Sequence, residues 1–134
     1  MCYNSNCKIE ITSRIDGTVN TVSATGKVIR THSDIRFVYT LDGDDCTLSV
    51  CESEVVQIRR GEQNIKMTFR KGEKTDCFLE SGGFSGIFSV FTDDLQCTMR
   101  DINGKIGTQI FKLLIVYMLG DQKTELNFSA EYKL

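Results

Sequence analysis

The sequence predicts an all-β fold in which an antiparallel meander of short strands closes into a barrel with little helix. Apolar and polar residues alternate with a period of two along almost the whole chain, and no stretch keeps a helical period. The chain has 11 glycines and no proline, so Gly, Asp and Asn must form the turns. Closure into a barrel hides the edges of a long meander, and a two-sheet sandwich is the alternative.

The N-terminal third contains the longest strands. Residues 7–15 alternate cleanly, and Asp16-Gly17 behind them is a strong hairpin signal. Residues 18–30 read as a second strand in which Gly26 marks a bulge or bend. Residues 35–41 alternate again after a short turn, so the chain begins as a meander.

Shorter segments follow, separated by turns. The candidate strands are residues 47–51, 54–60, 65–69, 75–79, 84–92, 95–102, 105–119 and 126–134. With the first three they make eleven candidate segments, from which we expect roughly eight to ten short strands, a number that suits a small barrel. No repeat, linker or low-complexity tract divides the chain, so we expect one domain over residues 1–134.

Composition excludes several classes of protein. Forty per cent hydrophobic and 25% charged residues are typical of a folded chain, and a net charge of −2 disfavours nucleic-acid or membrane-surface binding. The first ten residues lack the pattern of a signal peptide, and the longest apolar run, residues 113–119, is too short to span a membrane. We therefore expect a cytoplasmic protein whose six cysteines are reduced thiols.

Residues 35–61, IRFVYTLDGDDCTLSVCESEVVQIRRG, combine an aromatic strand ending in Tyr, an acidic turn with Gly, a Thr-rich strand and the motif V-x-x-x-R-x-G. Followed by MTFRKG and, near the C-terminus, IFKLLIVYMLGDQKTELNFSAEYK, this order resembles the YwiB-like family of small bacterial proteins over about Cys7 to Lys133. The resemblance implies a calycin-like barrel, similar in shape to lipocalins, with no known activity. The residues that match the family pattern are Tyr39, Arg59, Gly61, Gly72, Thr92 and Tyr117.

No catalytic or metal-binding constellation is evident, so we expect no enzyme, no metal and no cofactor. His32 is the only histidine, and it lies in a predicted turn without the nucleophile that a catalytic histidine needs. Cys46 and Cys51 are five residues apart, which places them on opposite faces of one strand, where they cannot chelate together. The acidic residues of segment 42–54 and the pair Asp93-Asp94 lie in predicted turns and should be solvated.

The most basic stretch, residues 58–72, contains five Lys or Arg residues. Its alternation predicts a hairpin around Gly61 with Lys66 and Arg70 on the wet face, and the acidic segment 42–54 can neutralise it. Phe69 shares a face with apolar residues rather than with the basic ones, so the stretch lacks the stacking platform of a single-strand binder. We expect no nucleic-acid binding here.

Arg59 shares a face with Val55 and Gln57, and alternation leaves open whether that face looks into the barrel. An inward Arg59 needs a partner, because an unpaired buried charge is very unfavourable. Asp101, Glu52 or an anionic ligand can serve as that partner. An outward Arg59 is a surface arginine.

Residues 113–119 are apolar on both faces. One face lines the core with Phe111, Leu113, Ile115, Tyr117 and Leu119. The other face presents Leu114, Val116 and Met118, which another element or a second subunit must cover. With no helix predicted to cover it, we favour a homodimer contact.

Two functions remain open. In the first, a small amphipathic molecule binds inside the barrel near Tyr39, Arg59, Tyr117 and Thr92. In the second, the protein is an interaction or regulatory module without a ligand, which docks a partner or a copy of itself through Leu114, Val116 and Met118.

Overall fold

The computed structural model describes residues 3–101 and 107–133, with side chains from residues 5–99 and 107–133. This part of the chain forms ten strands and no helix, and so contains no helix long and apolar enough to cross a membrane. The strands are β1 (Tyr3–Ile15), β2 (Thr18–Arg30), β3 (Asp34–Leu41), β4 (Asp44–Cys51), β5 (Val55–Arg60), β6 (Gln63–Phe69), β7 (Lys74–Ser81), β8 (Phe84–Asp101), β9 (Thr108–Leu119) and β10 (Gln122–Lys133).

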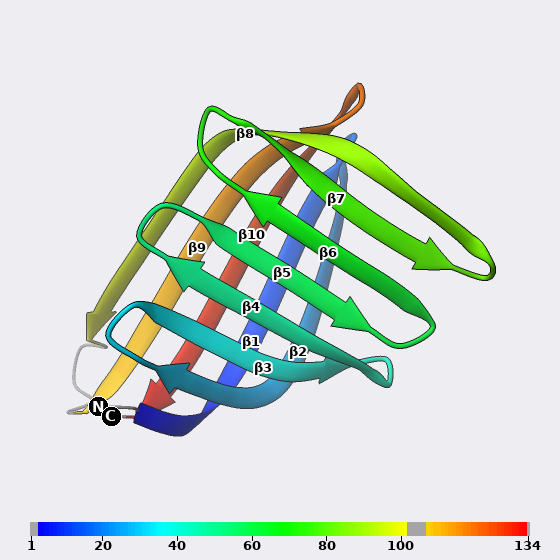
Figure 1. Cartoon of the computed structure of the whole chain (residues 1–134). Coiled ribbons are helices and arrows are strands. Elements are labelled where there is room, and N and C mark those ends of the chain that lie inside the picture. Colours follow the sequence, from blue (N-terminus) through cyan, green and yellow to red (C-terminus); the bar gives the residue numbers. More distant parts are fainter. Residues whose placement is uncertain (1–2, 102–106, 134) are drawn as a thin grey trace.

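The strands follow one another around a closed antiparallel barrel, and β1 pairs with β10 to close it. Figure 1 shows two layers that cross at a large angle, with β3 to β7 in front and β1, β2, β9 and β10 behind. We call these layers the front sheet and the back sheet. The predicted all-β barrel is confirmed, and the sandwich is excluded because the pairing of β1 with β10 leaves one continuous sheet.

β8 turns one corner between the two sheets. Residues 84–91 pair with β7 in the front sheet, whereas residues 94–101 pair with β9 in the back sheet. The register shifts between Thr92 and Asp94, and the extra residue of such a bulge bends a strand. The sequence predicted two strands here, 84–92 and 95–102, but the structure has the single strand β8. The prediction was wrong because the bulge reverses the alternation, which in the sequence looks like the end of a strand. Ile102 lies outside the described residues.

β2 turns the other corner at Gly26, where the sequence predicted a bulge or bend. β2 pairs with β1 over its whole length, but with β3 only from Gly26 to Arg30. A Cβ atom at Gly26 would lie 2.2 Å from the Val38 carbonyl oxygen and 2.9 Å from the Tyr39 Cβ. β3 therefore crosses β2 so closely at this corner that any side chain would force the backbone apart.

The space between the two sheets is filled by apolar side chains. The rings of Phe37 and Phe111 lie 5.0 Å apart, and Phe37 and Phe128 are separated by the same distance. Burying a side chain of this size stabilises the fold by about 1.5–3 kcal/mol. Phe111, Leu113 and Ile115 of β9 are buried in this core as predicted, while Tyr117 and Leu119 pack against its border.

Candidate functional site

Arg59 faces into the barrel near its rim. It lies directly across from Cys46, which in turn lies across from Tyr39, and both of these are buried. The Arg59 Nε donates a hydrogen bond of 2.7 Å to Oδ2 of Asp44, the first residue of β4. The ion-pair partner is thus Asp44 rather than Glu52; the side chain of Asp101 lies outside the described residues.

Asp44 is 7% exposed, so the prediction that it is solvated was wrong. Its Oδ1 accepts a hydrogen bond of 3.3 Å from the Glu62 backbone, and a Cβ at Gly61 would lie only 1.8 Å from that oxygen. The hydrogen bond from Arg59 is the main reason that the pKa of Asp44 is lowered. Arg59 and Gly61, the R and G of V-x-x-x-R-x-G, therefore build a receptor for a carboxylate of the same chain.

Other charges of the basic stretch are neutralised by nearby acids, as the sequence predicted. The Arg70 Nε lies 2.8 Å from a carboxylate oxygen of Glu54, which belongs to the acidic segment 42–54. Lys71 lies 3.5 Å from Asp94, which is part of the β8 bulge rather than of a turn as predicted. These contacts stabilise the surface weakly, since both basic side chains are exposed.

Thr92 and Gly72 hold the β8 corner through the backbone. The Gly72 N–H donates to the Thr92 carbonyl at 2.7 Å, and the Thr92 N–H donates to the Glu73 carbonyl at 3.2 Å. Gly72 has a φ of 76°, a left-handed conformation that favours glycine. The Thr92 hydroxyl is buried, and it has no hydrogen-bond partner in the part of the chain that the structure describes.

Tyr117 lies across from Thr92 on β9, and its ring centroid is 5.0 Å from that of Phe69. Burial raises its pKa, and its hydroxyl hydrogen-bonds Thr124. The four predicted ligand residues therefore form two groups, with Tyr39 and Arg59 at the front sheet and Thr92 and Tyr117 at the β8 corner. Their role in ligand binding stays a prediction.

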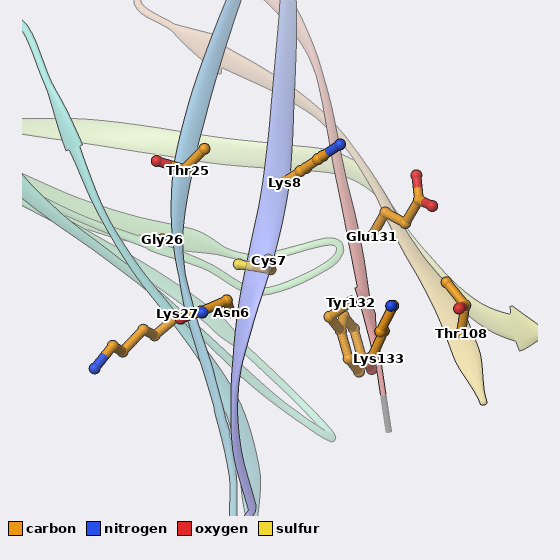
Figure 2. Close-up of a pocket in the computed structure, with 10 residues that line it drawn as sticks. All are labelled: Asn6, Cys7, Lys8, Thr25, Gly26, Lys27, Thr108, Glu131, Tyr132 and Lys133. Atoms are coloured by element: carbon orange, nitrogen blue, oxygen red, sulfur yellow. The ribbon is translucent and has the colours of Figure 1, made fainter.

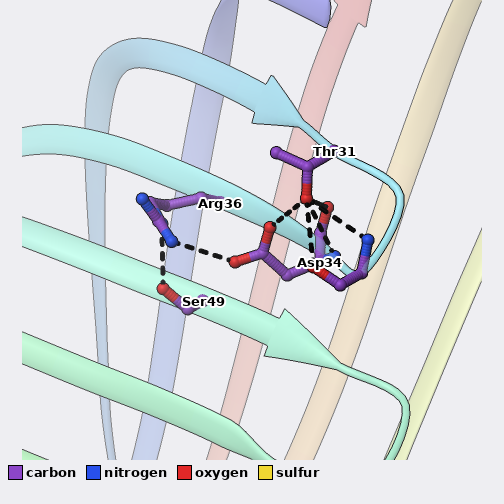
Figure 3. A network of polar contacts seen from close by, with 5 residues as sticks. Thr31, Asp34, Arg36 and Ser49 are labelled. Atoms are coloured by element: carbon purple, nitrogen blue, oxygen red, sulfur yellow. Dashed lines mark hydrogen bonds and ion pairs between the residues drawn. The ribbon is translucent and has the colours of Figure 1, made fainter. Parts of the chain in front are cut away.

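A third polar cluster fixes the turn between β2 and β3 (Figure 3). Asp34 accepts a hydrogen bond of 2.6 Å from the Thr31 hydroxyl and a charged one of 3.0 Å from Arg36. Arg36 also donates to Ser49 on β4 at 3.3 Å. Thr31, Asp34, Arg36 and Ser49 thus hydrogen-bond to one another, so this cluster stabilises the turn rather than binding a ligand.

Several open grooves border the barrel, among them two that differ in size. The larger, of about 1000 Å³, crosses the back sheet, and Figure 2 shows Lys8 and Lys27 extending to opposite sides of β1. The smaller, of about 570 Å³, spans β5 to β8. It is lined by residues of both alternation phases, Arg59, Ile65 and Leu79 as well as Ile58, Phe78 and Ile87.

The largest exposed apolar side chains gather around β8, where sequence reasoning did not place a site. Phe78, Ile87 and Phe91 are 46%, 65% and 37% exposed. Phe78 lies across from Ile87, and Phe91 across from Met118, so two apolar pairs lie on the outside of β7, β8 and β9, with Asp76 and Ser89 between them. We call Phe78, Ile87, Phe91 and Met118 the β8 surface.

The predicted strip of Leu114, Val116 and Met118 is half-buried, and its Met118 end continues into the β8 surface. The missed signal was present in FSGIFSVF, residues 84–91, which has large apolar residues in both phases of its alternation and carries no charge. That is the property that singled out residues 113–119.

The cysteines do not combine into a site in the described residues. Cys46 is buried and Cys51 exposed on the same strand, so the two face apart as predicted. Burial raises the thiol pKa of Cys7, Cys46 and Cys77. No three His, Cys, Asp or Glu residues converge as metal ligands in this part of the chain, and Cys2 lies outside it.

Together these features define a class of protein, a small closed barrel with ten antiparallel strands in the described residues. Its motif residues contact other groups of the same chain: Arg59 and Gly61 meet the Asp44 carboxylate, and Gly72 and Thr92 hydrogen-bond through the backbone. The chain belongs to the family described as a domain of unknown function (DUF1934), whose profile matches residues 7–132.

Among solved structures, the chain is similar to the crystal structure of the YwiB protein from Bacillus subtilis, with a TM-score of 0.80 and 17% identity. The match covers 98% of this chain and 94% of that one, and it confirms the YwiB-like resemblance. At this identity the likeness shows the fold alone. No curated protein matches the sequence.

Proposed function

We propose that this barrel is a non-enzymatic interaction module that works as a homodimer, with the β8 surface docking a second copy. One observation carries the proposal. Ile87 is 65% exposed and lies directly across from Phe78, itself 46% exposed, on the outside of the barrel. Contiguous exposed apolar side chains with a polar rim are typical of interaction sites.

The position of this surface in the front sheet supports the proposal. A single outward row of cross-strand partners crosses the whole front sheet and consists of Val38, Thr47, Ile58, Lys66, Phe78 and Ile87. Only its β8 end holds two adjacent large apolar side chains, and Phe91 and Met118 form a second apolar pair beyond Ser89, where β8 reaches the back sheet. Val38, at the opposite end of the row, is an isolated exposed apolar residue.

A second copy is a suitable occupant for reasons of charge and symmetry. The four side chains of the β8 surface are uncharged, and Lys74 and Asp76, charged residues beside them on β7, have opposite signs. Two copies therefore meet with little repulsion between like charges. A net charge of −2 adds little repulsion between two whole molecules.

A small amphipathic ligand inside the barrel is the second candidate. The buried Thr92 hydroxyl favours it, because an unpaired polar atom in a core is a natural contact for a ligand. Against it, the aromatic rings between the sheets are only 5.0 Å apart, so side chains fill that space.

Sedimentation velocity over a concentration series tests the homodimer. The wild-type protein should change from monomer to dimer as concentration rises. Ile87→Glu should weaken the dimer roughly 10²–10³-fold, because a central contact is worth about 2 kcal/mol or more and is lost twice in a symmetric interface. Val38→Glu makes the same change at the far end of the row and should leave the dimer intact. A wild-type protein that stays monomeric at all concentrations contradicts the proposal.

Native mass spectrometry of the purified protein separates the two candidates. If the protein is a homodimer without a ligand, the observed mass is that of two chains with nothing bound. A monomer that carries a constant additional small mass would instead support the ligand hypothesis.

A further inference from the structure

β8 presents a free backbone edge beside the β8 surface. Residues 84–91 pair with β7 on one side, but on the other side the pairing with β9 begins only at Val90. Within the part of the chain that the structure describes, residues 84–89 therefore have a strand neighbour on one side only. In Figure 1 this segment forms the upper border of the front sheet, where the β7–β8 hairpin projects from the barrel.

The hairpin geometry identifies which backbone groups are free. Gly82 and Gly83 have φ values of 56° and 84° and link Ser81 directly to Phe84, as in a two-residue type I′ turn. Residues that flank such a turn are hydrogen-bonded to each other, and bonded and non-bonded pairs then alternate along the hairpin. Ser85, Ile87 and Ser89 consequently direct their N–H and C=O groups away from β7.

This edge lacks the usual protection. Natural edge strands carry lysine, proline or inward charges that prevent pairing with another chain, but residues 84–92, FSGIFSVFT, contain neither charge nor proline. Ile87 is exposed on the outer face, and Phe84 and Phe88 are 54% and 39% exposed on the opposite face. A docked side chain can cover one of these faces, whereas an added strand covers both and also pairs the backbone.

We propose that two copies of the protein pair through residues 84–89 of β8 in antiparallel orientation, so that their front sheets join into one continuous sheet. This inference rests on the proposed function, since Ile87 belongs to both the edge and the β8 surface. A strand that pairs with itself antiparallel generates a two-fold axis and a closed dimer. No like charges are placed opposite one another by that pairing.

The β2 edge is the other candidate partner for β8. Residues 18–25 of β2 also have only one strand neighbour, β1, within the described residues. Pairing of β8 with the β2 edge of the next copy would be heterologous, however, and would continue into an open filament unless it closed as a ring. The self-pairing of β8 needs no further copy and satisfies both apolar edges at once.

Amide hydrogen exchange measured by NMR tests the pairing directly. At concentrations where the dimer dominates, the amides of Ser85, Ile87 and Ser89 should exchange at least roughly 100-fold more slowly than in dilute monomer, because they become hydrogen-bonded. The amides of Thr21 and Ser23 on the β2 edge are the matched control and should exchange fast at both concentrations.

A pair of proline variants tests the same contact without relying on exchange. Ser85→Pro removes an N–H that points away from β7, so the barrel should keep its fold and its thermal unfolding while the dimer is lost. Ser23→Pro makes the same change on the β2 edge and should leave the dimer unchanged.

The outcomes separate this inference from the proposed function. A dimer with fast exchange at Ser85, Ile87 and Ser89, or a Ser85→Pro variant that folds and still dimerises, overturns the strand pairing while the homodimer holds. Slow exchange at Thr21 and Ser23 as well would show the β8-to-β2 arrangement and also overturn the inference. A wild-type protein that is always monomeric overturns both proposals.

Discussion

The barrel turns its two corners in β2 and β8, and the two strands bend by different means. At Gly26 the absence of a side chain allows β3 to cross within van der Waals distance of the β2 backbone. At Thr92 an extra residue bends β8, and the loop between β6 and β7 pairs with the bend through Gly72. One corner depends on a missing side chain, and the other on an inserted residue and its hydrogen bonds.

Each corner also leaves half a strand with one free edge, but the chemistry of the two edges differs. Residues 18–25 of β2 are mostly Thr, Ser and Asn, and the Thr21 hydroxyl lies 3.2 Å from that of Thr12 on β1. Val19 is the large apolar side chain that is exposed in this segment. Residues 84–89 of β8 instead expose Phe84, Ile87 and Phe88. A polar edge is satisfied by water, whereas an apolar edge gains by being covered, so only the β8 corner is suited to be an interface.

The largest effect on stability should come from adding a side chain at the β2 corner. Gly26→Ala places a Cβ 2.2 Å from the Val38 carbonyl oxygen, a backbone atom that cannot move alone. We expect a loss of about 3 kcal/mol or more in the free energy of unfolding, at the upper end of overpacking effects. Urea denaturation measures the change.

Gly86→Ala is the matched control in β8. Neither glycine has a positive φ, and the nearest atoms to a Cβ at Gly86 are ring atoms of Phe84 and Phe88 at 3.3 Å, which can move aside. We expect a change of less than about 1 kcal/mol. Equal losses for the two variants would contradict the distinction between the corners.

Replacing Asp44, whose carboxylate contacts Arg59 and Gly61, should have an intermediate effect on the stability of the fold. A carboxyl whose pKa is lowered in the folded state contributes stability above its unfolded value of about 3.9, and this contribution disappears as pH falls through the folded value. Asp44→Asn should thus be less stable than wild type at neutral pH, and the difference should shrink as pH falls below about 4.

Thermal unfolding at a series of pH values checks this expectation, with Asp45→Asn as the control at the exposed neighbouring residue. The pKa of Asp94 is also lowered, mainly by its hydrogen bond with Gln96, so some acid sensitivity should persist in Asp44→Asn. Equal stability of Asp44→Asn and Asp45→Asn at neutral pH would show that the contact of Arg59 with Asp44 does not stabilise the fold.

A small effect of opposite sign is expected at the β8 corner. Thr92→Val keeps the backbone and shape but removes a buried hydroxyl that has no partner in the described residues. We expect the free energy of unfolding to rise by about 1 kcal/mol, since an unsatisfied buried polar group is destabilising by about 1–3 kcal/mol. A loss of stability would show that the hydroxyl is occupied, and would support the interior ligand instead.

The strands and the closed barrel could be predicted from the sequence, because alternation and turn residues are local signals. The bulge at Thr92 and Asp94 could not, since an inserted residue and a strand break produce the same change of phase. Asp44 was predicted to be solvated because its neighbours form an acidic turn, whereas its partner Arg59 lies 15 residues further along the chain.

The family residues Arg59, Gly61, Gly72 and Thr92 were recognised in the sequence, yet their role was visible only in space. Arg59 and Gly61 meet a carboxylate from β4, and Gly72 and Thr92 meet each other across 20 residues of chain. The β8 surface was missed for a different reason. Alternation indicates which residues share a face, but it does not reveal that residues 84–89 extend beyond their second neighbouring strand.

The antiparallel pairing of β8 between two copies can be observed by an isotope-filtered NOE experiment on an equal mixture of ¹³C-labelled and unlabelled protein. It records only contacts between different copies at dimer concentration. If two copies pair through β8, intermolecular NOEs connect residues 84–89 of one copy with residues 84–89 of the other. NOEs from residues 84–89 to residues 18–25, or a dimer whose intermolecular NOEs avoid β8, would contradict it.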